Sequence, residues 1–564
     1  MSRHQQSRTE LLRTLKKAFQ LAVLSRKKNS PSTDELADMI SQPRSASRRN
    51  FFSTAAAAGL MIGAGGLIEA CKKGEEVLST SGALTSERNG GCTSNIVIVG
   101  GGMAGLNCCY QLKKAGVYSK VYEASARVGG RIFTANNIMA PGLTTELGGE
   151  FIDSIHTDMI HLANEFNLPL LDTFAPSETA LVYQDYFFNG QHYSLQEVID
   201  AFVPYASQIQ SDIDALPNVI VYNNYGNADY YDNQSISEYF DSIGMSGWIR
   251  EALEVAYLTE YGREVDDQSS INFLYLFSPD TANGTFDIFG ESDERYKISG
   301  GNQRVIAKLY EQVQSRVTME RKLTKISQLA NGTYKLWFEK PNGTTVQVSA
   351  DVVVLAIPFT ILRTVQMDMT LPDWKINAIQ NLGYGSNAKL MMGFNSRHWR
   401  TQGYAGYNFS DNGMQTGWDN SELQGGTKGG YTVFLGGNLG NDLGSGTPQS
   451  QKDIYLPKLE QIWSGISEKY NGNVQRMHWP TQPYTLGSYA CYRPGQFQTI
   501  AGAERKSIGN LHFAGEHCSL SYQGYMNGAA ETGKKAANKI LETLCGGNGN
   551  NRVEEEEVKP LRYH

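Results

Sequence analysis

Apolar residues gather in short, uninterrupted runs, the first at 96–99 and another at 350–358. Runs without polar alternation are typical of strands buried on both faces of a parallel sheet. A short strand is expected at 322–326. Elsewhere apolar residues recur every three or four positions, which predicts amphipathic helices over 159–166, 194–213, 236–256 and 303–316. Strands that alternate with helices in this way predict an α/β fold.

Glycines follow the first apolar run at once. Gly100, Gly102 and Gly105 fill the G-x-G-x-x-G positions between the expected strand and the helix after it. The first glycine allows a tight turn, and the second lets the backbone approach a pyrophosphate that rests on the helix N-terminus. Glu123 ends the next apolar run, where a carboxylate accepts hydrogen bonds from an adenosine ribose. The pattern predicts a dinucleotide site.

A second glycine cluster, Arg127-Val-Gly-Gly-Arg131, follows a few residues later. Its glycines let the chain pass close to a cofactor, and Arg131 can neutralise a pyrophosphate. Nicotinamide enzymes do not need this cluster. Together with Glu146-Leu-Gly-Gly-Glu-Phe-Ile152, it resembles the flavin-dependent amine oxidase family, which includes monoamine oxidases and L-amino acid oxidases. The resemblance implies FAD as the cofactor.

The resemblance extends to residues 510–517 and 524–533 and covers about 93–546 in all. It implies that Glu516 hydrogen-bonds the ribityl or phosphate region of FAD, and that a helix beginning near Tyr525 directs the amide of Met526 at the flavin. A helix N-terminus stabilises the negative charge that reduced flavin accumulates. The implied fold is α/β, an FAD-binding Rossmann-like domain built from discontinuous segments and interleaved with an α+β substrate domain.

The family motifs map onto a set of residues expected to bind the cofactor. These are Gly100, Gly102, Met103, Ala104, Gly105, Glu123, Ala124, Arg127, Gly130, Arg131, Gly148, Gly149, Glu150, Phe151, Leu323, Trp479, Gly515, Glu516, Tyr525 and Met526. Some monoamine oxidases attach FAD covalently to a cysteine just before the first of two active-site tyrosines. Ser488 occupies that position here and Cys491 does not align with it, so FAD is expected to bind non-covalently.

Three residues are expected to act in catalysis. By family resemblance, Tyr489 and Tyr525 form two aromatic walls before the flavin, where facing rings stabilise developing positive charge. Lys389 matches the family lysine that holds a water beside flavin N5 and assists dioxygen reduction. The implied reaction transfers a hydride from the α carbon of an amine to N5. The imine then hydrolyses to an aldehyde and ammonia or an amine, and dioxygen reoxidises the flavin to give hydrogen peroxide.

The substrate is expected to be an amine, with an L-amino acid as the alternative. An L-amino acid oxidase needs a carboxylate clamp, ideally a bidentate arginine. Residues 152–158 contain none, although Arg250 or Arg493 could approach from elsewhere. Two further alternatives are a desaturase or protoporphyrinogen-type oxidase, which the tyrosines and Lys389 disfavour, and a flavoprotein used for binding only.

The motifs predict how the chain is divided. The expected segments are an export signal with a long basic leader (1–71), a linker (72–92), three FAD-binding parts (93–165, 296–360 and 496–546), two substrate-domain parts (166–295 and 361–495) and a tail (547–564). The glycine-rich run 436–446 is expected to be a loop between strands rather than a phosphate cradle, because no lysine or helix start follows it.

Residues 47–68 resemble a twin-arginine export signal of bacterial type, because two arginines precede a weakly apolar stretch rich in Ala and Gly. The twin-arginine translocase is then an expected partner. Residues 67–71 resemble a lipoprotein cleavage box with Cys71 as the lipid acceptor, although Glu69 departs from the usual small residue. The expected location is outside the cytoplasm, as a periplasmic protein or a membrane-anchored lipoprotein.

The composition of the chain limits the classes of ligand and partner that it is expected to bind. A net charge of −7 and a pI of about 5.8 argue against nucleic-acid binding, which needs a basic surface. The seven cysteines show no paired Cys-x-x-Cys spacing, so no metal site is expected. The expected small-molecule partners are an amine or amino acid and dioxygen.

Overall fold

The computed structural model describes residues 94–281 and 284–544. The expected export signal, its lipid-acceptor Cys71, the linker and the C-terminal tail lie outside the described residues.

A five-stranded parallel sheet carries the first glycine motif at the end of its central strand. In spatial order its strands are β20 (Leu511–Phe513), β13 (Val352–Leu355), β1 (Ile96–Val99), β2 (Ser119–Tyr122) and β9 (Val317–Thr318). Every residue of β1 and β13 is buried, because one face of the sheet packs on helices and the other on strands of a second sheet, which leaves no face for polar side chains. Of the apolar run at 350–358, only the centre, Val352–Leu355, belongs to β13. Pro358 lies beyond this strand and directly precedes a short helix.

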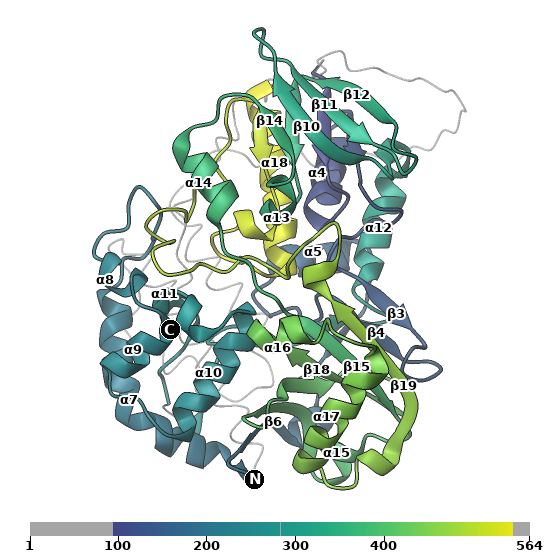
Figure 1. The fold of residues 1–564 in the computed structure, drawn as a ribbon. Helices are drawn as coiled ribbons and strands as arrows, with labels where there is room; N and C mark the ends of the chain where they lie inside the picture. The colour runs from purple at the N-terminus through teal and green to yellow at the C-terminus, as the bar shows by residue number, and fades with distance from the viewer. Residues whose placement is uncertain (1–93, 282–283, 545–564) are drawn as a thin grey trace, which may run out of the picture. The chain divides into compact units, whose positions relative to one another are not determined.

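Two helices from opposite ends of the described chain lie against each other beside this sheet. They are α4 (Met103–Lys114), which follows the glycine turn, and α18 (Met526–Leu544), drawn purple and yellow in Figure 1. Gly533 makes the approach possible, because a Cβ there would lie 2.2 Å from the carbonyl oxygen of Ala104. A third helix, α12 (Gln303–Val313), also contacts α4. The first and last FAD motifs are thus held together.

A second sheet has four strands. In spatial order they are β12 (Thr345–Ala350), β11 (Tyr334–Glu339), β10 (Lys322–Gln328) and β14 (Gln366–Asp368). Two short helices, α13 (Phe359–Leu362) and α14 (Asp373–Asn381), follow β13 and β14 along the chain. Leu323, one of the residues expected to bind the cofactor, lies on β10 and is buried.

A seven-stranded, mixed sheet carries the expected catalytic lysine. Its spatial order is β19 (Tyr470–His478), β15 (Ala388–Phe394), β18 (Gly429–Leu435), β17 (Gln415–Asp419), β16 (Tyr404–Ser410), β6 (Val182–Phe188) and β7 (Gln191–Tyr193). Its pairs are antiparallel except for β16 with β6. Two small antiparallel pairs join β3 (Thr134–Asn136) to β4 (Thr144–Glu146) and β5 (Leu170–Asp172) to β8 (Tyr296–Ile298).

The remaining helices lie in the segments expected to form the substrate domain, with one exception. They are α6 (Pro176–Thr179), α7 (Leu195–Ala215), α8 (Asp229–Asp232), α9 (Ile236–Ser242), α10 (Trp248–Tyr261), α11 (Ser270–Leu276), α15 (His398–Thr401), α16 (Gly437–Asp442) and α17 (Pro448–Ile462). The exception is α5 (Thr157–Glu165), which lies in the first expected FAD-binding part and contacts α18. Among the helices of residues 94–281 and 284–544, none has the length and apolar character needed to cross a membrane.

Two expectations about local structure are wrong. The single helix expected over 236–256 is two helices, α9 and α10, because Gly244 and Gly247 adopt positive φ angles of 67° and 76° between them. The glycine-rich run 436–446 is not simply a loop, since it contains α16. Gly440 lets α16 pack closely, because a Cβ there would lie 2.4 Å from the carbonyl oxygen of Ser386. The mixed α/β class itself is as expected.

Candidate active site

A cavity of about 570 Å³ runs past the glycine turns and reaches the aromatic residues of the substrate half. Of the residues expected to bind cofactor or act in catalysis, all line this cavity except Gly105. They come from segments spread over more than 400 residues (from Gly100 to Met526, 526 − 100 = 426). The fold therefore brings the predicted site together.

The first glycine turn is built around close backbone contacts. Gly100 has a φ of +107°, and a Cβ on Gly105 would lie 1.9 Å from the carbonyl oxygen of Gly100. Gly105 thus lets the helix approach the turn, although it does not face the cavity. Gly102 has no heavy atom within 4 Å of its Cβ position and lines the cavity, so its backbone is open to a ligand. The N–H of Gly129 donates to the carbonyl oxygen of Gly101 and joins the two glycine clusters.

Glu123 stabilises the turn from the end of β2. Its Oε2 accepts a hydrogen bond of 2.6 Å from the N–H of Gly101, and its Oε1 accepts from the N–H and hydroxyl of Ser125. The carboxylate is 9% exposed and lines the cavity with Ala124. It stands where the motif places an acceptor for a ribose.

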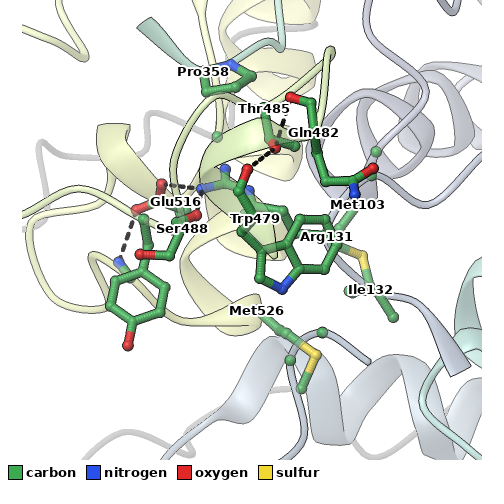
Figure 2. Close-up of a pocket in the computed structure, with 18 of the residues that line it drawn as sticks. Met103, Arg131, Ile132, Pro358, Trp479, Gln482, Thr485, Ser488, Glu516 and Met526 are labelled. Atoms are coloured by element: carbon green, nitrogen blue, oxygen red, sulfur yellow. Dashed lines mark hydrogen bonds and ion pairs between the residues drawn. The ribbon is translucent and has the colours of Figure 1, made fainter. Parts of the chain in front are cut away.

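Arg131 and Glu516 connect the second and last motifs (Figure 2). The Nη1 of Arg131 donates to Oε1 of Glu516 at 2.9 Å and to the carbonyl oxygen of Ser488. Glu516 also accepts from the backbone N–H groups of Ala490 and Gly524. The carboxylate therefore ties three chain segments together at the cavity wall, in addition to the ligand contact that the motif implies.

Trp479 and Met526 lie on the cavity side of their elements (Figure 2). The indole Nε1 of Trp479 donates to the carbonyl oxygen of Leu147 at 3.2 Å. A Cβ on Gly148 would lie 1.8 Å from the carbonyl oxygen of Arg131, and one on Gly149 would lie 2.8 Å from Met526. The Gly148–Gly149 pair thus lets three motifs meet.

These residues fit a flavin dinucleotide. The backbone of Gly102 is accessible from the cavity, and Arg127 and Arg131 supply positive charge for a diphosphate. The first turn of α18 faces the cavity through Met526 and Ala529. A helix N-terminus stabilises negative charge at such a place.

Tyr489 and Tyr525 line the other end of the cavity, and α10 anchors both. The hydroxyl of Tyr525 donates to Oε1 of Glu260 at 2.7 Å, and the hydroxyl of Tyr489 donates to the carbonyl oxygen of Thr259 at 3.4 Å. Thr259 and Glu260 are neighbours near the end of α10. The ring of Tyr489 also lies 3.7 Å from the Cβ position of Gly524, directly before Tyr525.

Three carboxyl groups line the same end of the cavity, and none belongs to a motif that predicted them. Burial raises the pKa of Asp153 to about 8 and also raises the pKa values of Glu260 and Glu294, which repel one another electrostatically. Glu294 lies near the ring of Tyr407, whose hydroxyl is its hydrogen-bond partner. No repeated spacing links these three acids, so periodicity could not identify them.

Aromatic rings surround the acids. Phe151 packs edge-on against Trp418 with ring centroids 5.5 Å apart, and Tyr407 stacks on Trp418 at 5.9 Å. Aromatic faces and carboxyl groups thus line this end of the cavity, which is called the aromatic chamber below.

Lys389 is buried at the start of β15, with 3% of its surface exposed. Its Nζ donates to the carbonyl oxygens of Glu146 and Gly148 at 3.1 and 2.9 Å, and to Oε2 of Glu150 at 2.9 Å. Three acceptors from one loop thus fix the ammonium at the cavity wall between the motif residues and the aromatic chamber.

The arginines considered for a carboxylate clamp lie elsewhere. Arg250 pairs with Asp241 and Glu254, and Arg493 pairs with Asp267. Neither lines the cavity, whose arginines among the described residues are Arg127, Arg131 and Arg321. Arg127 and Arg131 belong to the second glycine cluster, and Arg321 directly precedes β10, the strand that contains Leu323.

The cavity has no cysteine among its described lining residues. Cys491 is fully buried and accepts a long contact of 3.6 Å from the side-chain amide of Asn272. Ser488 lines the cavity, and its hydroxyl donates to Oδ1 of Asn387 at 2.6 Å.

Known proteins share this fold. The structure matches that of cyclohexylamine oxidase from Brevibacterium oxydans with a TM-score of 0.69 and 20% identity, covering 80% of this chain and 99% of the other. Wild-type putrescine oxidase bound to putrescine matches with a TM-score of 0.66 and 19% identity, over the same shares. At this identity the likeness establishes the fold.

Sequence relatives cover most of the chain as well. A probable flavin-containing monoamine oxidase A of Dictyostelium discoideum is 23% identical over 80% of this chain and 98% of its own length. An L-amino-acid oxidase of Demansia vestigiata is 25% identical over 79% of this chain and 87% of its own length.

The fold and the cavity define an oxidoreductase of the dinucleotide-binding α/β class. The family model for flavin containing amine oxidoreductases matches residues 103–541, so the chain belongs to that family. It is a flavin-containing amine oxidoreductase whose cofactor is FAD.

Proposed function

We propose that this enzyme oxidises amines rather than L-amino acids. The observation that carries the proposal is the set of polar groups in the aromatic chamber. Asp153, Glu260 and Glu294 line it, whereas the described arginines of the cavity are Arg127 and Arg131 of the second glycine cluster and Arg321 before β10. Carboxyl groups accept hydrogen bonds from an amine, but they offer no bidentate cation to bind the carboxylate of an amino acid.

The chamber also suits the proton that an amine must lose before oxidation. Aromatic surroundings disfavour a charged ammonium, and a carboxylate in reach accepts its proton. Asp153 lines the chamber, and because burial raises its pKa to about 8 it accepts that proton only when it is ionised, so this step is favoured as pH rises toward 8. FAD, when bound, supplies the acceptor for a hydride equivalent from the carbon beside nitrogen and passes the electrons to dioxygen.

The remaining roles fall to residues around that chamber. Tyr489 and Tyr525 hold the substrate between rings that α10 fixes in place. Lys389 presents a fixed positive charge at the cavity wall, where charge of the opposite sign develops as dioxygen is reduced.

Anaerobic mixing tests the substrate class. Purified enzyme is mixed with a panel of monoamines, diamines and L-amino acids while the visible absorbance of the flavin is followed. Amines are expected to bleach it, and bleaching by L-amino acids alone would overturn the proposal in favour of an L-amino acid oxidase.

A matched pair of variants sharpens this test. Glu260→Gln replaces a carboxyl group of the chamber with an amide and is expected to raise the KM of an amine substrate about fivefold, since one hydrogen bond contributes about 0.5–1.5 kcal/mol. Glu311→Gln removes an exposed glutamate of α12 and should leave KM unchanged. An unaltered KM in Glu260→Gln would contradict a role for this carboxyl group in substrate binding.

We further propose that FAD is held without a covalent bond. Ser488 stands before Tyr489 and its hydroxyl is engaged with Asn387, while Cys491 is buried away from the cavity. Acid precipitation should leave a colourless pellet and a yellow supernatant. A yellow pellet would refute non-covalent binding.

Export by the twin-arginine route, with lipid attachment at Cys71, is also proposed, and it rests on the sequence alone. Replacing both arginines at 48–49 with lysine should retain the protein in the cytoplasm, and Cys71→Ala should release it from the membrane fraction. Cell fractionation of a producing bacterium measures both, and an unchanged distribution would refute this route.

A further inference from the structure

One carboxylate near the cavity is shared by two buried lysines. Oε2 of Glu150 lies 2.9 Å from Nζ of Lys389, and Oε1 of Glu150 lies 3.2 Å from Nζ of Lys297. The side chains of all three are at most 9% exposed. Glu150 and Lys389 line the cavity and belong to predicted motifs, whereas Lys297 does neither.

Lys297 lies outside the cavity lining and against the ring of Phe151. It is the central residue of the short strand β8, and its Nζ stands 4.6 Å from the ring centroid of Phe151. Nζ of Lys389 stands 5.1 Å from the ring centroid of Trp418, which packs against Phe151. The two ammonium groups therefore flank the carboxylate inside a poorly solvated region, where charges act over longer distances than in water.

The charges around Lys297 can be counted. Burial alone would raise the pKa of Glu150, but Lys389 and Lys297 outweigh it and hold that pKa low, so the carboxylate is ionised. Burial would lower the pKa of Lys297, but nearby acids, with Glu150 the strongest of them, outweigh it and raise that pKa, so Lys297 is charged.

Two further acids face Lys297. Glu422 lies 3.6 Å from its Nζ, and burial raises the pKa of Glu422 to about 8, so that carboxyl is mostly protonated at neutral pH. The charge of Asp419 is balanced by that of Arg397, whose Nε lies 3.9 Å from Oδ2 of Asp419. The Lys389–Glu150–Lys297 triad therefore carries a net charge of +1 (two ammonium groups and one carboxylate).

We propose that Lys297 is a positioning residue that keeps the Glu150–Lys389 pair net positive and so favours the reduced, more negative form of the flavin. Without Lys297, the carboxylate of Glu150 cancels the charge of Lys389. With it, one positive charge remains to stabilise negative charge at the cofactor. The inference rests on the proposed placement of Lys389 beside the flavin.

The reduction potential of the bound flavin tests this, since it reports charge independently of turnover. Lys297→Met takes the triad from +1 to 0, so it should weaken the preference for reduced flavin about tenfold, a fall of about 30 mV for a two-electron couple. Glu150→Gln takes it to +2 and should raise the potential. The double variant restores +1 and should lie near the wild type.

Controls separate charge from structure. Lys297→Arg keeps the charge and should keep the potential, and Lys458→Met removes a half-buried lysine of α17 far from the cavity lining and should not change it. A structural defect would move the two single variants in the same direction. That outcome, or an unchanged potential in Lys297→Met with FAD bound, would overturn the proposal.

Two further measurements keep the test decisive. If Lys297→Met does not fold, Lys297→Gln and Glu150→Gln are predicted to shift the potential in opposite directions, and a common direction refutes the inference. Flavin reoxidation in Lys389→Met tests the proposed function separately. Unchanged reoxidation there would fault the role of Lys389 in dioxygen reduction, while the potentials would still report the charge balance.

Discussion

The two ends of the cavity are built by different means. The cofactor end consists of backbone turns, in which glycines such as Gly100 and Gly105 permit contacts that a Cβ would block. The substrate end consists of side chains, with Tyr489 and Tyr525 tied to Thr259 and Glu260 of α10. Backbone turns leave a local mark in the sequence, and side chains gathered from distant elements do not. Each end should therefore fail in its own way when it is altered.

The largest effect is expected at the cofactor end. Gly105→Ala places a Cβ 1.9 Å from the carbonyl oxygen of Gly100, a backbone atom that cannot move without opening the turn. Overpacking costs about 1–3 kcal/mol or more, so the variant should retain less than a tenth of the wild-type flavin. The ratio of flavin to protein absorbance measures this.

Gly425→Ala is the matched control, because its Cβ position has no heavy atom within 4 Å. Full flavin content in Gly105→Ala would contradict the account of the turn.

At the boundary between the two ends, Lys389→Met should slow flavin reoxidation about 100-fold, as expected for removal of one preorganised electrostatic group. Reduction by substrate should change far less, because the tyrosines and carboxyl groups remain. Stopped-flow absorbance separates the two half-reactions. Equal slowing of both would refute a specific role with dioxygen.

Asp153 of the substrate end is one of several buried acids that should show in the pH dependence of stability. In the folded protein, burial raises the pKa values of Glu146 to about 7 and of Asp153 and Glu422 to about 8. These groups ionise near pH 4 when unfolded, so from about pH 4 to about pH 8 the folded state binds more protons. The free energy of unfolding should therefore fall as pH rises through this window.

Asp153→Asn removes one of these groups and should reduce the slope by up to about 1.4 kcal/mol per pH unit. Asp200→Asn, at an exposed position of α7, is the control. Thermal unfolding across the window measures both, and a slope unaffected by Asp153→Asn would disprove the raised pKa.

The smallest effect is expected at Cys491, which follows Tyr489 by two residues along the chain but does not line the cavity. Cys491→Ala should leave the flavin content and spectrum as in the wild type, with a stability loss of about 1 kcal/mol from the small space created. Loss of bound flavin would show that this thiol contributes to cofactor retention.

The same contrast explains what could be predicted from the sequence. Glycine spacing, the acid at Glu123 and the final motif around Glu516 located the cofactor end, because each reflects a local backbone requirement. The break between α9 and α10 at Gly244 and Gly247 was missed, because the apolar periodicity continues across it.

Glu260 and Lys297 could not have been found in this way. In the sequence, Glu260 is an ordinary polar position of an amphipathic helix. Its place in the cavity wall follows only from the packing of α10 against β16 and β17. Lys297 lies in a short strand, and only the fold brings it to Glu150, 147 residues away.

The parallel sheet also fixes when the protein can acquire its cofactor. Its edge strand β20 and the neighbouring helix α18 are among the last parts of the described chain, yet β20 pairs with β13 and α18 lies against α4. A nascent polypeptide that has released only its first motifs from the ribosome has neither Glu516 nor Met526. Capture of FAD therefore waits until α18 has been translated, and termination before α18 yields a colourless product however intact its first glycine turn.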